Sequence, residues 1–287
     1  MSRRQSHLAI AAFLLFLLIA SSVVLWAADV TPEEVVAKSL DAIGSATARK
    51  DLKSRAIQGR VTYRILVGGS GAINGKFVFA SEGQKSNYLF KINANGFLGE
   101  QFICDGSKAS VAGTYPDKSR SEFGNFILVQ DAPIRENLLG GVWSTGWPLL
   151  DLDGRKAKVH SEGIKKIDGR ELIALRYQPR KNTDLEIFLY FDPQTYQHVM
   201  TTYRMTISAT IGMHGETSSA RTNEARYRLE EHFSDFQVVD GLTLPTHYDL
   251  RYTFEGLSGH TKSIEWDVKA TDIMNNRSID PSAFVPQ

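Results

Sequence analysis

The chain has 287 residues, 42% of them hydrophobic, and its 33 basic and 32 acidic residues give a net charge of +1 at pH 7. This composition is typical of a globular protein with a sizeable core, and the balanced charge argues against a nucleic-acid partner. Cys104 is the only cysteine, so no internal disulfide stabilises the fold. Its apolar neighbours predict a buried thiol rather than a catalytic one.

The first 28 residues are typical of an export signal. Arg3 and Arg4 precede an uncharged stretch over residues 8–28, and Ala27 and Ala28 offer small residues for cleavage. The stretch is also long enough to span a bilayer, so the alternative is an uncleaved anchor. Either way, residues 29–287 are expected to form a single domain that works outside the cytoplasm.

An amphipathic helix is predicted next, with Thr31 as its cap, Pro32 in its first turn and Gly44 at its end. From residue 56 onward the apolar period changes to two, which predicts a series of antiparallel strands. One of the intervening turns is predicted at Asp105-Gly106.

The middle of the chain lacks this alternation. Residues 121–130 and 133–142 are predicted as two short helices, followed by an apolar loop that contains two tryptophans. Strands return after residue 157, with Asp-Gly turns at 168–169 and 240–241. The total is about ten to twelve strands and three helices, a mainly β (α+β) fold built on one large curved antiparallel sheet.

The strands carry aromatic residues on one face, and a sheet this wide curls, so its concave side needs a cover. The candidates for this cover are the N-terminal helix and the segment that contains Trp143 and Trp147. Two such short elements rarely fill the space completely, which predicts a hydrophobic ligand cavity; a tightly packed core is the alternative. The predicted lining comprises Phe77, Phe79, Tyr88 and Phe90 from the early strands and Val142, Trp143 and Trp147 from the cover.

Catalytic and cofactor motifs are missing from the sequence: it has no metalloprotease H-E-x-x-H, C-x-x-C, P-loop or dinucleotide fingerprint. The turn at 240–241 would place His232 opposite Asp249 and Ser234 opposite His247. Such a group suggests catalysis or metal binding, but polar residues on an exposed sheet face give the same pattern. We therefore expect no enzyme activity, no cofactor and no metal site.

Several segments, taken in order, resemble the LolA/LolB-like outer-membrane lipoprotein-sorting superfamily. They are TPEEVVAKSLDAIG, IQGRVTYRI, DGRELIALRYQP, LYFDPQTYQHVMTTYR, FSDFQVVDGLTLP and IDPSAFVPQ. The resemblance covers nearly all of residues 29–287 and implies a half-open β-barrel with helices as a lid, which holds acyl chains in an apolar cavity. Known members carry lipoproteins across the periplasm. This chain is longer than those carriers, and we transfer no functional residue from them.

The leading prediction is therefore a periplasmic carrier of lipid or lipoprotein acyl chains, which exchanges them with membrane-bound donor and acceptor proteins. The first alternative is a sensor or protein-interaction module of the cell envelope, tethered to the inner membrane by an uncleaved N-terminus. The second is a hydrolase that uses His232 and His247.

Overall fold

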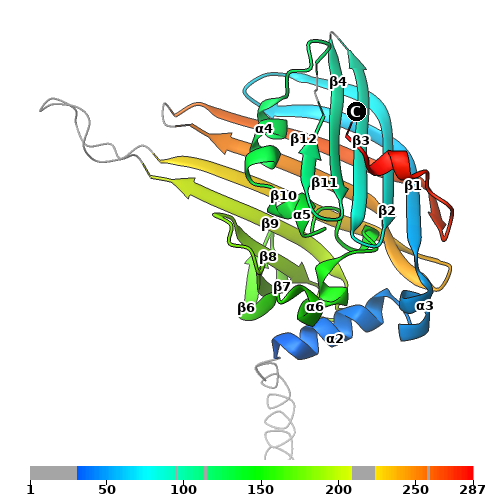
Figure 1. Cartoon of the computed structure of the whole chain (residues 1–287). Coiled ribbons are helices and arrows are strands. Elements are labelled where there is room, and N and C mark those ends of the chain that lie inside the picture. Colours follow the sequence, from blue (N-terminus) through cyan, green and yellow to red (C-terminus); the bar gives the residue numbers. More distant parts are fainter. Residues whose placement is uncertain (1–30, 95, 113–114, 209–223, 257–258, 287) are drawn as a thin grey trace, which may run out of the picture. The chain divides into compact units, whose positions relative to one another are not determined.

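One antiparallel sheet of 12 strands dominates the computed structural model of the chain (Figure 1). The structure describes residues 31–94, 96–112, 115–208, 224–256 and 259–286. The strands are β1 (Ser54–Val67), β2 (Gly71–Glu82), β3 (Lys85–Ala94), β4 (Phe97–Asp105), β5 (Ala109–Val111), β6 (Lys158–Ile167), β7 (Arg170–Gln178), β8 (Glu186–Phe191), β9 (His198–Ile207), β10 (Ala225–Val239), β11 (Leu242–Glu255) and β12 (Thr261–Asn275). The predicted mainly β fold with a curved sheet is thus confirmed.

The predicted Asp-Gly turns are confirmed in detail. Asp168 and Gly169 have φ values of 49° and 81°, and Asp240 and Gly241 have φ values of 51° and 77°. Two successive positive φ angles are the mark of the tight hairpin turn that matches the twist of the flanking strands. The register that follows pairs Ser234 with His247 and continues past Pro245, which faces Phe236.

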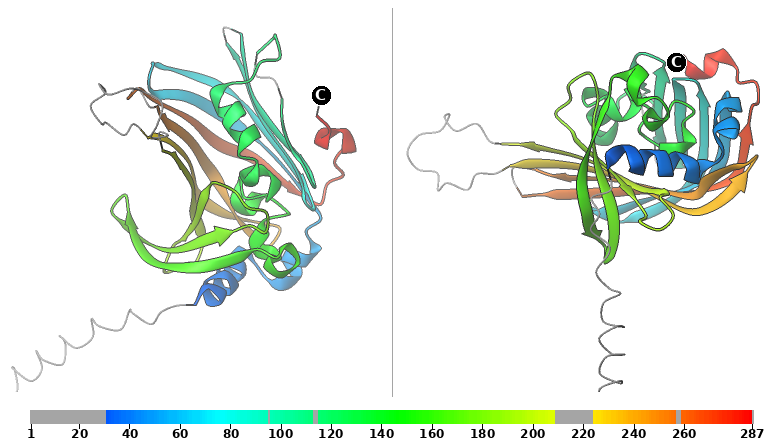
Figure 2. Two further views of the ribbon diagram at one scale, coloured as in Figure 1. Left: turned by 60° about the vertical axis from the view of Figure 1, so that its left-hand side comes forward. Right: turned by 90° about the horizontal axis from the view of Figure 1, so that it is seen from below.

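The order of the strands explains how the sheet is covered. It runs β5-β4-β3-β2-β1-β12-β11-β10-β9-β8-β7-β6, so β12 and β11 lie in the middle while β5 and β6 form the two edges. These edge strands follow each other along the chain, and the connection between them must therefore cross the sheet. Residues 115–157 make this crossing over the concave face (Figure 2), and we call this segment the cover.

Short helices make up the cover and close one end of the sheet. Those of the cover are α4 (Glu122–Val129), α5 (Ala132–Arg135), η1 (Gly141–Trp143), η2 (Pro148–Leu150) and α6 (Leu152–Arg155). The N-terminal helices α2 (Pro32–Ile43) and α3 (Ala46–Asp51) lie at the end of the sheet where Gly44 pairs with Leu242, and η3 (Pro281–Phe284) packs its buried Phe284 onto the body.

One predicted helix is wrong in most of its length. Residues 133–142 were expected to be helical, but α5 ends at Arg135. Asn137 and Gly140 then adopt left-handed φ values of 56° and 73°, which cannot continue a right-handed helix. The predicted first helix, by contrast, is confirmed as α2.

Pro32–Gln287 forms one compact unit. The predicted signal or anchor over residues 1–28 lies outside the described residues. Among the helices that are described, none has the length and apolar character needed to cross a membrane.

Candidate functional site

A groove of about 760 Å³ opens between α4 and the ends of three neighbouring strands, β9, β10 and β11. We call it the α4 groove. Phe126 and Val129 of α4 line it together with Met205 and Ile207 of β9. The full lining comprises Glu122, Asn125, Phe126, Val129, Gln130, Asp184, Met205, Thr206, Ile207, Ser208, Tyr227 and Tyr252.

The α4 groove has an aromatic interior and an exposed aliphatic rim. The ring of Phe126 stacks on Tyr227 with 5.5 Å between centroids and lies 5.3 Å from the ring of Tyr252. At the rim, Val129 is 76% exposed and Ile207 is 48% exposed. Single exposed apolar residues are normal on a surface, but here they border a concave, aromatic-lined space, which is the usual character of a ligand site.

The polar groups of the α4 groove favour an uncharged hydrogen-bond acceptor over an anion as the polar part of a ligand. Tyr252 is fully buried, and its hydroxyl has no hydrogen-bond partner among the described residues. Burial raises the pKa of this phenol, which keeps it a neutral donor. The charged lining residues that the structure describes are both acidic: Glu122, paired with Lys262 at 3.2 Å, and Asp184. This setting suits an uncharged acceptor better than an anion.

The seven residues predicted to line a cavity lie in the packed interior. Phe77, Phe79, Tyr88, Phe90, Val142, Trp143 and Trp147 are all buried. The ring of Trp143 lies 5.7 Å from Phe77 and 5.1 Å from Tyr248, measured between centroids. None of the seven lines the α4 groove. Val142 and Trp147 border a separate space of about 30 Å³, enough for about one water molecule. Their role in ligand binding stays a prediction, and it would require the cover to move.

The sequence contained one signal for the α4 groove. Phe126, Ile127, Leu128 and Val129 are four consecutive apolar residues on a short helix, so they cannot all face the sheet. Phe126 and Ile127 are buried, whereas Leu128 and Val129 are exposed. Strand alternation alone could not reveal the groove, because its other wall comes from strand ends distant in the sequence.

A buried carboxylate fastens the cover to the sheet. Glu231 of β10 accepts hydrogen bonds from the backbone N–H of Gly140 at 2.6 Å, from the Tyr203 hydroxyl at 2.7 Å and from the Tyr248 hydroxyl at 2.9 Å. Burial raises the pKa of Glu231 to about 7 despite these three donors. The carboxylate therefore holds the cover at a point where two tyrosines of the sheet converge.

A buried arginine makes a second attachment. The guanidinium of Arg55 donates to the carbonyl oxygens of Val142 and Trp143 at 2.6 and 3.1 Å and to the side chain of Asn275 at 2.9 Å. Desolvation lowers its pKa to about 9. The indole N–H of Trp143 also donates to the carbonyl of Pro245 at 2.8 Å. Residues 140–143 are thus bound to β1, β10 and β11 by polar groups within the core.

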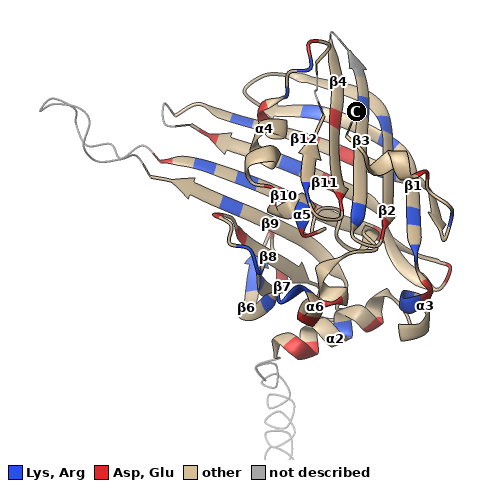
Figure 3. Ribbon diagram, in the orientation of Figure 1, with Lys and Arg blue, Asp and Glu red and all other residues tan. Residues whose placement is uncertain are grey.

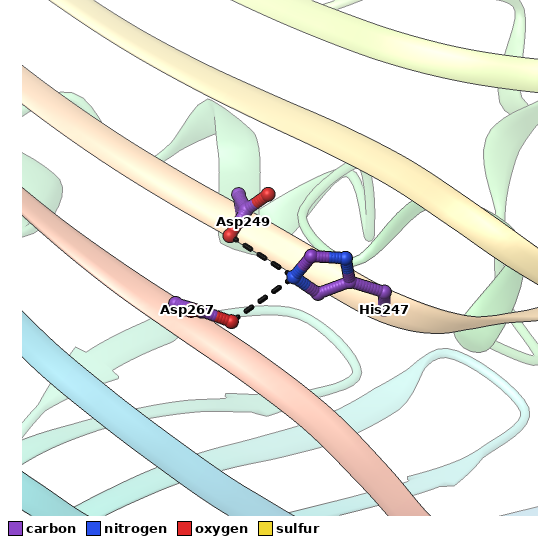
Figure 4. Close-up of side chains that lie close together, drawn as sticks. All are labelled: His247, Asp249 and Asp267. Atoms are coloured by element: carbon purple, nitrogen blue, oxygen red, sulfur yellow. Dashed lines mark hydrogen bonds and ion pairs between the residues drawn. The ribbon is translucent and has the colours of Figure 1, made fainter.

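A polar cluster lies on the opposite, convex face of the sheet. His247 Nε2 lies 3.0 Å from Asp267 Oδ1 and 3.5 Å from Asp249 Oδ1 (Figure 4). Its Nδ1 lies 3.2 Å from the hydroxyl oxygen of Ser234. The predicted pairings of His232 with Asp249 and of Ser234 with His247 are confirmed. His247, Asp249 and Asp267 offer three ligand atoms within 4.8 Å of one another.

Two neighbouring arginines make this cluster part of an ion-pair network. Arg64 binds Asp267 and Glu265, each at 2.8 Å, and Arg251 binds Glu265 at 2.8 Å. A cation bound there would compete with the guanidinium of Arg64 for Asp267. The network joins β1, β11 and β12, and its geometry alone indicates no ligand, so we assign no catalytic or metal-binding role to it.

Known proteins resemble this chain only in their structures. No protein-family model matches it, and a search of the curated proteins finds no match. Among the solved structures, a DUF1329 family protein from Desulfovibrio piger aligns over 88% of this chain and 96% of its own, with 10% identity and a TM-score of 0.48.

Two further structures bear names from the family that the sequence resembles. A LolA superfamily protein from Nitrosomonas europaea aligns over 89% of this chain and 98% of its own, with 12% identity and a TM-score of 0.42. A domain named for outer membrane lipoprotein sorting, from Vibrio parahaemolyticus, aligns over 87% of this chain and 97% of its own, with 12% identity and a TM-score of 0.39. These likenesses, at 10–12% identity, concern the fold alone.

Proposed function

We propose that this chain is an exported, non-catalytic carrier that binds acyl chains of lipids or lipoproteins in the α4 groove. The observation that carries the proposal is the open groove itself, with its aromatic floor and its exposed aliphatic rim. Its volume of about 760 Å³ lies within the range of roughly 300–1,000 Å³ that is usual for small-molecule sites. Export is supported by the apolar stretch over residues 8–28.

Burial of methylene groups would provide the binding energy. Each buried methylene contributes about 0.8 kcal/mol, so ten of them contribute about 8 kcal/mol before the entropic costs of association. That gain is enough for reversible binding without any charged contact, as a carrier needs. No bond has to be made or broken, so no catalytic group is required.

The polar groups of the α4 groove narrow the ligand class. An ester or amide carbonyl that displaces the side chains covering the buried, unpartnered hydroxyl of Tyr252 would accept a hydrogen bond from it. A free carboxylate would meet Asp184 and Glu122 at the same site, without a basic residue in the described lining. We therefore favour acyl chains in ester or amide linkage over free fatty acids.

Val129→Arg is expected to weaken the binding of a fluorescent acyl probe at least ten-fold, because a guanidinium on the rim disrupts its apolar contact. The matched control is Val238→Arg on β10. Val238 is 73% exposed, almost the same as Val129, but lies outside the groove. Probe titration of both variants and the parent gives the comparison.

Two results would contradict the proposal. One is equal weakening by the two substitutions, and the other is the absence of acyl-probe binding by the parent protein. Mass spectrometry of organic extracts of the purified chain supplies an independent check, since a carrier is expected to retain lipid that the Val129→Arg variant loses.

Tyr252→Phe tests the ligand class. Removal of a buried hydroxyl without a partner is expected to leave the free energy of unfolding unchanged or slightly higher. The substitution is expected to weaken the binding of an acyl ester about two- to ten-fold. The binding of an alkane-tailed probe without a carbonyl should stay the same. Tyr248→Phe is the contrasting control, because that hydroxyl already donates to Glu231 and its loss lowers stability. Equal weakening of both probes by Tyr252→Phe would rule out a hydrogen bond to the ester.

A tethered sensor or interaction module remains the alternative function. It predicts a lasting membrane fraction, whereas N-terminal sequencing of a mature chain that begins near Ala28 would argue against the tether. A hydrolase is the second alternative, against our expectation of no enzyme activity; unchanged turnover of lipid esters after His232→Ala and His247→Ala would exclude a role for these histidines.

A further inference from the structure

A row of basic side chains crosses the convex face of the sheet. The register pairs Lys269 of β12 with Arg60 of β1, Arg60 with Lys76 of β2, and Lys76 with Lys91 of β3. We call these four residues the basic row. Their chain neighbours Val61, Phe77, Phe90 and Val268 are buried on the concave side, so the basic row lies on the opposite face. Figure 3 shows basic residues on neighbouring strands of the sheet.

The basic row is expected to lower the stability of the folded sheet, because its four positive charges repel one another. Neighbouring strands lie about 4.8 Å apart, so the four cations span roughly 15 Å in a nearly straight line. Like charges that face each other directly across a strand pair are destabilising. All four side chains are exposed, and no ion pair neutralises them within the part of the chain that the structure describes. Two carboxylates of β12 flank Lys269 on this face: Asp267, which Arg64 and His247 engage, and Asp272, opposite Gln58, which forms no ion pair with the four cations in the described part of the chain.

We propose that the basic row is a contact surface for a bilayer that carries anionic, phosphate-bearing lipids. A like-charged row that the fold does not need is explained by a partner that supplies the opposite charge. Three of the four residues are lysines, whose mobile, strongly hydrated ammonium groups suit a diffuse field of phosphates. A defined acidic peptide would favour arginines in fixed, two-pronged contacts.

Sedimentation with lipid vesicles tests the proposal, with phosphatidylcholine alone compared with an equal mixture of phosphatidylcholine and phosphatidylglycerol. The chain is expected to bind the mixed vesicles and to lose that binding as salt is raised. Lys76→Gln is expected to weaken binding about five-fold, and replacement of all four by Gln more than 100-fold. The control replaces four other exposed lysines by Gln for the same change in charge: Lys108, Lys118, Lys165 and Lys166.

The variant without the basic row is expected to unfold at the same temperature as the parent or higher, since repulsion is removed, so lost binding cannot be ascribed to misfolding. Both vesicle types carry acyl chains, so binding through the α4 groove alone would not depend on the anionic lipid. Equal binding to both vesicles, or equal loss in the control, would overturn the inference. So would binding to soluble heparin without binding to vesicles, which would identify a soluble polyanion instead.

Discussion

Glu231→Ala is expected to lower the free energy of unfolding by about 3–5 kcal/mol, among the largest effects of any single substitution in this chain. The change leaves the Gly140 N–H and the hydroxyls of Tyr203 and Tyr248 without their shared acceptor in the interior. It also empties the space of a buried side chain. Urea unfolding followed by tryptophan fluorescence measures the loss, since Trp143 lies in the segment that Glu231 holds.

The pH dependence gives a sharper test of the same group. In the unfolded chain Glu231 titrates near the usual value of 4.5, whereas in the fold its pKa is about 7. Between these values the folded state retains a proton that the unfolded state has lost. The stability that Glu231 contributes is therefore complete below pH 4.5 and falls as the pH rises to 7, by roughly 3 kcal/mol.

A buried histidine opposes this trend. Desolvation lowers the pKa of His198 to about 3, so its contribution is complete above pH 6.5 and is lost as the pH falls. Glu231→Gln keeps a side chain of nearly the same shape and removes only the titration of Glu231. The difference between the parent and this variant should therefore change with pH between 4.5 and 7. Parallel stability curves over that interval would show that Glu231 does not titrate as its environment indicates.

Local patterns in the sequence were sufficient to identify most of the strands and insufficient to show which strands pair. Alternation identified the strands, and the Asp-Gly pairs identified their turns, because both depend on neighbouring residues. The pairing of β1 with β12 joins Arg60 to Lys269 across more than 200 residues. Alternation specifies which face a residue takes but not which strand it meets, and this pair of cations would have argued against the pairing.

The same limit applies to the candidate site. The pattern placed Phe77, Phe79, Tyr88 and Phe90 on the concave face, where the structure has them. It could not show that Trp143 fills the space in front of them, because that depends on how the cover crosses the sheet. The α4 groove joins Val129 to Ile207 and Tyr252, and no local signal connects these positions.

Trp143→Ala separates the packed core from the α4 groove as the binding site. Trp143 is fully buried, contacts the rings of Phe77, Phe79 and Tyr248, and donates to the carbonyl of Pro245. Its truncation is expected to cost about 3–5 kcal/mol through lost contacts and the cavity left behind. Because Trp143 does not line the α4 groove, acyl-probe affinity there should stay within about two-fold of the parent.

The double variant Trp143→Ala with Val129→Arg identifies the origin of any remaining signal. Binding that survives both changes belongs to the core, and binding that disappears belongs to the α4 groove. If Trp143→Ala does not fold, Trp143→Phe opens a smaller space at lower cost and supports the same comparison. Suppose that Trp143→Phe lowers the acyl affinity more than ten-fold while Val129→Arg has no effect. The binding site would then be the one predicted from the sequence, formed by the seven buried residues. The cover would then have to lift from Glu231 and Arg55 to admit a ligand, and weakening either attachment should raise the rate of binding.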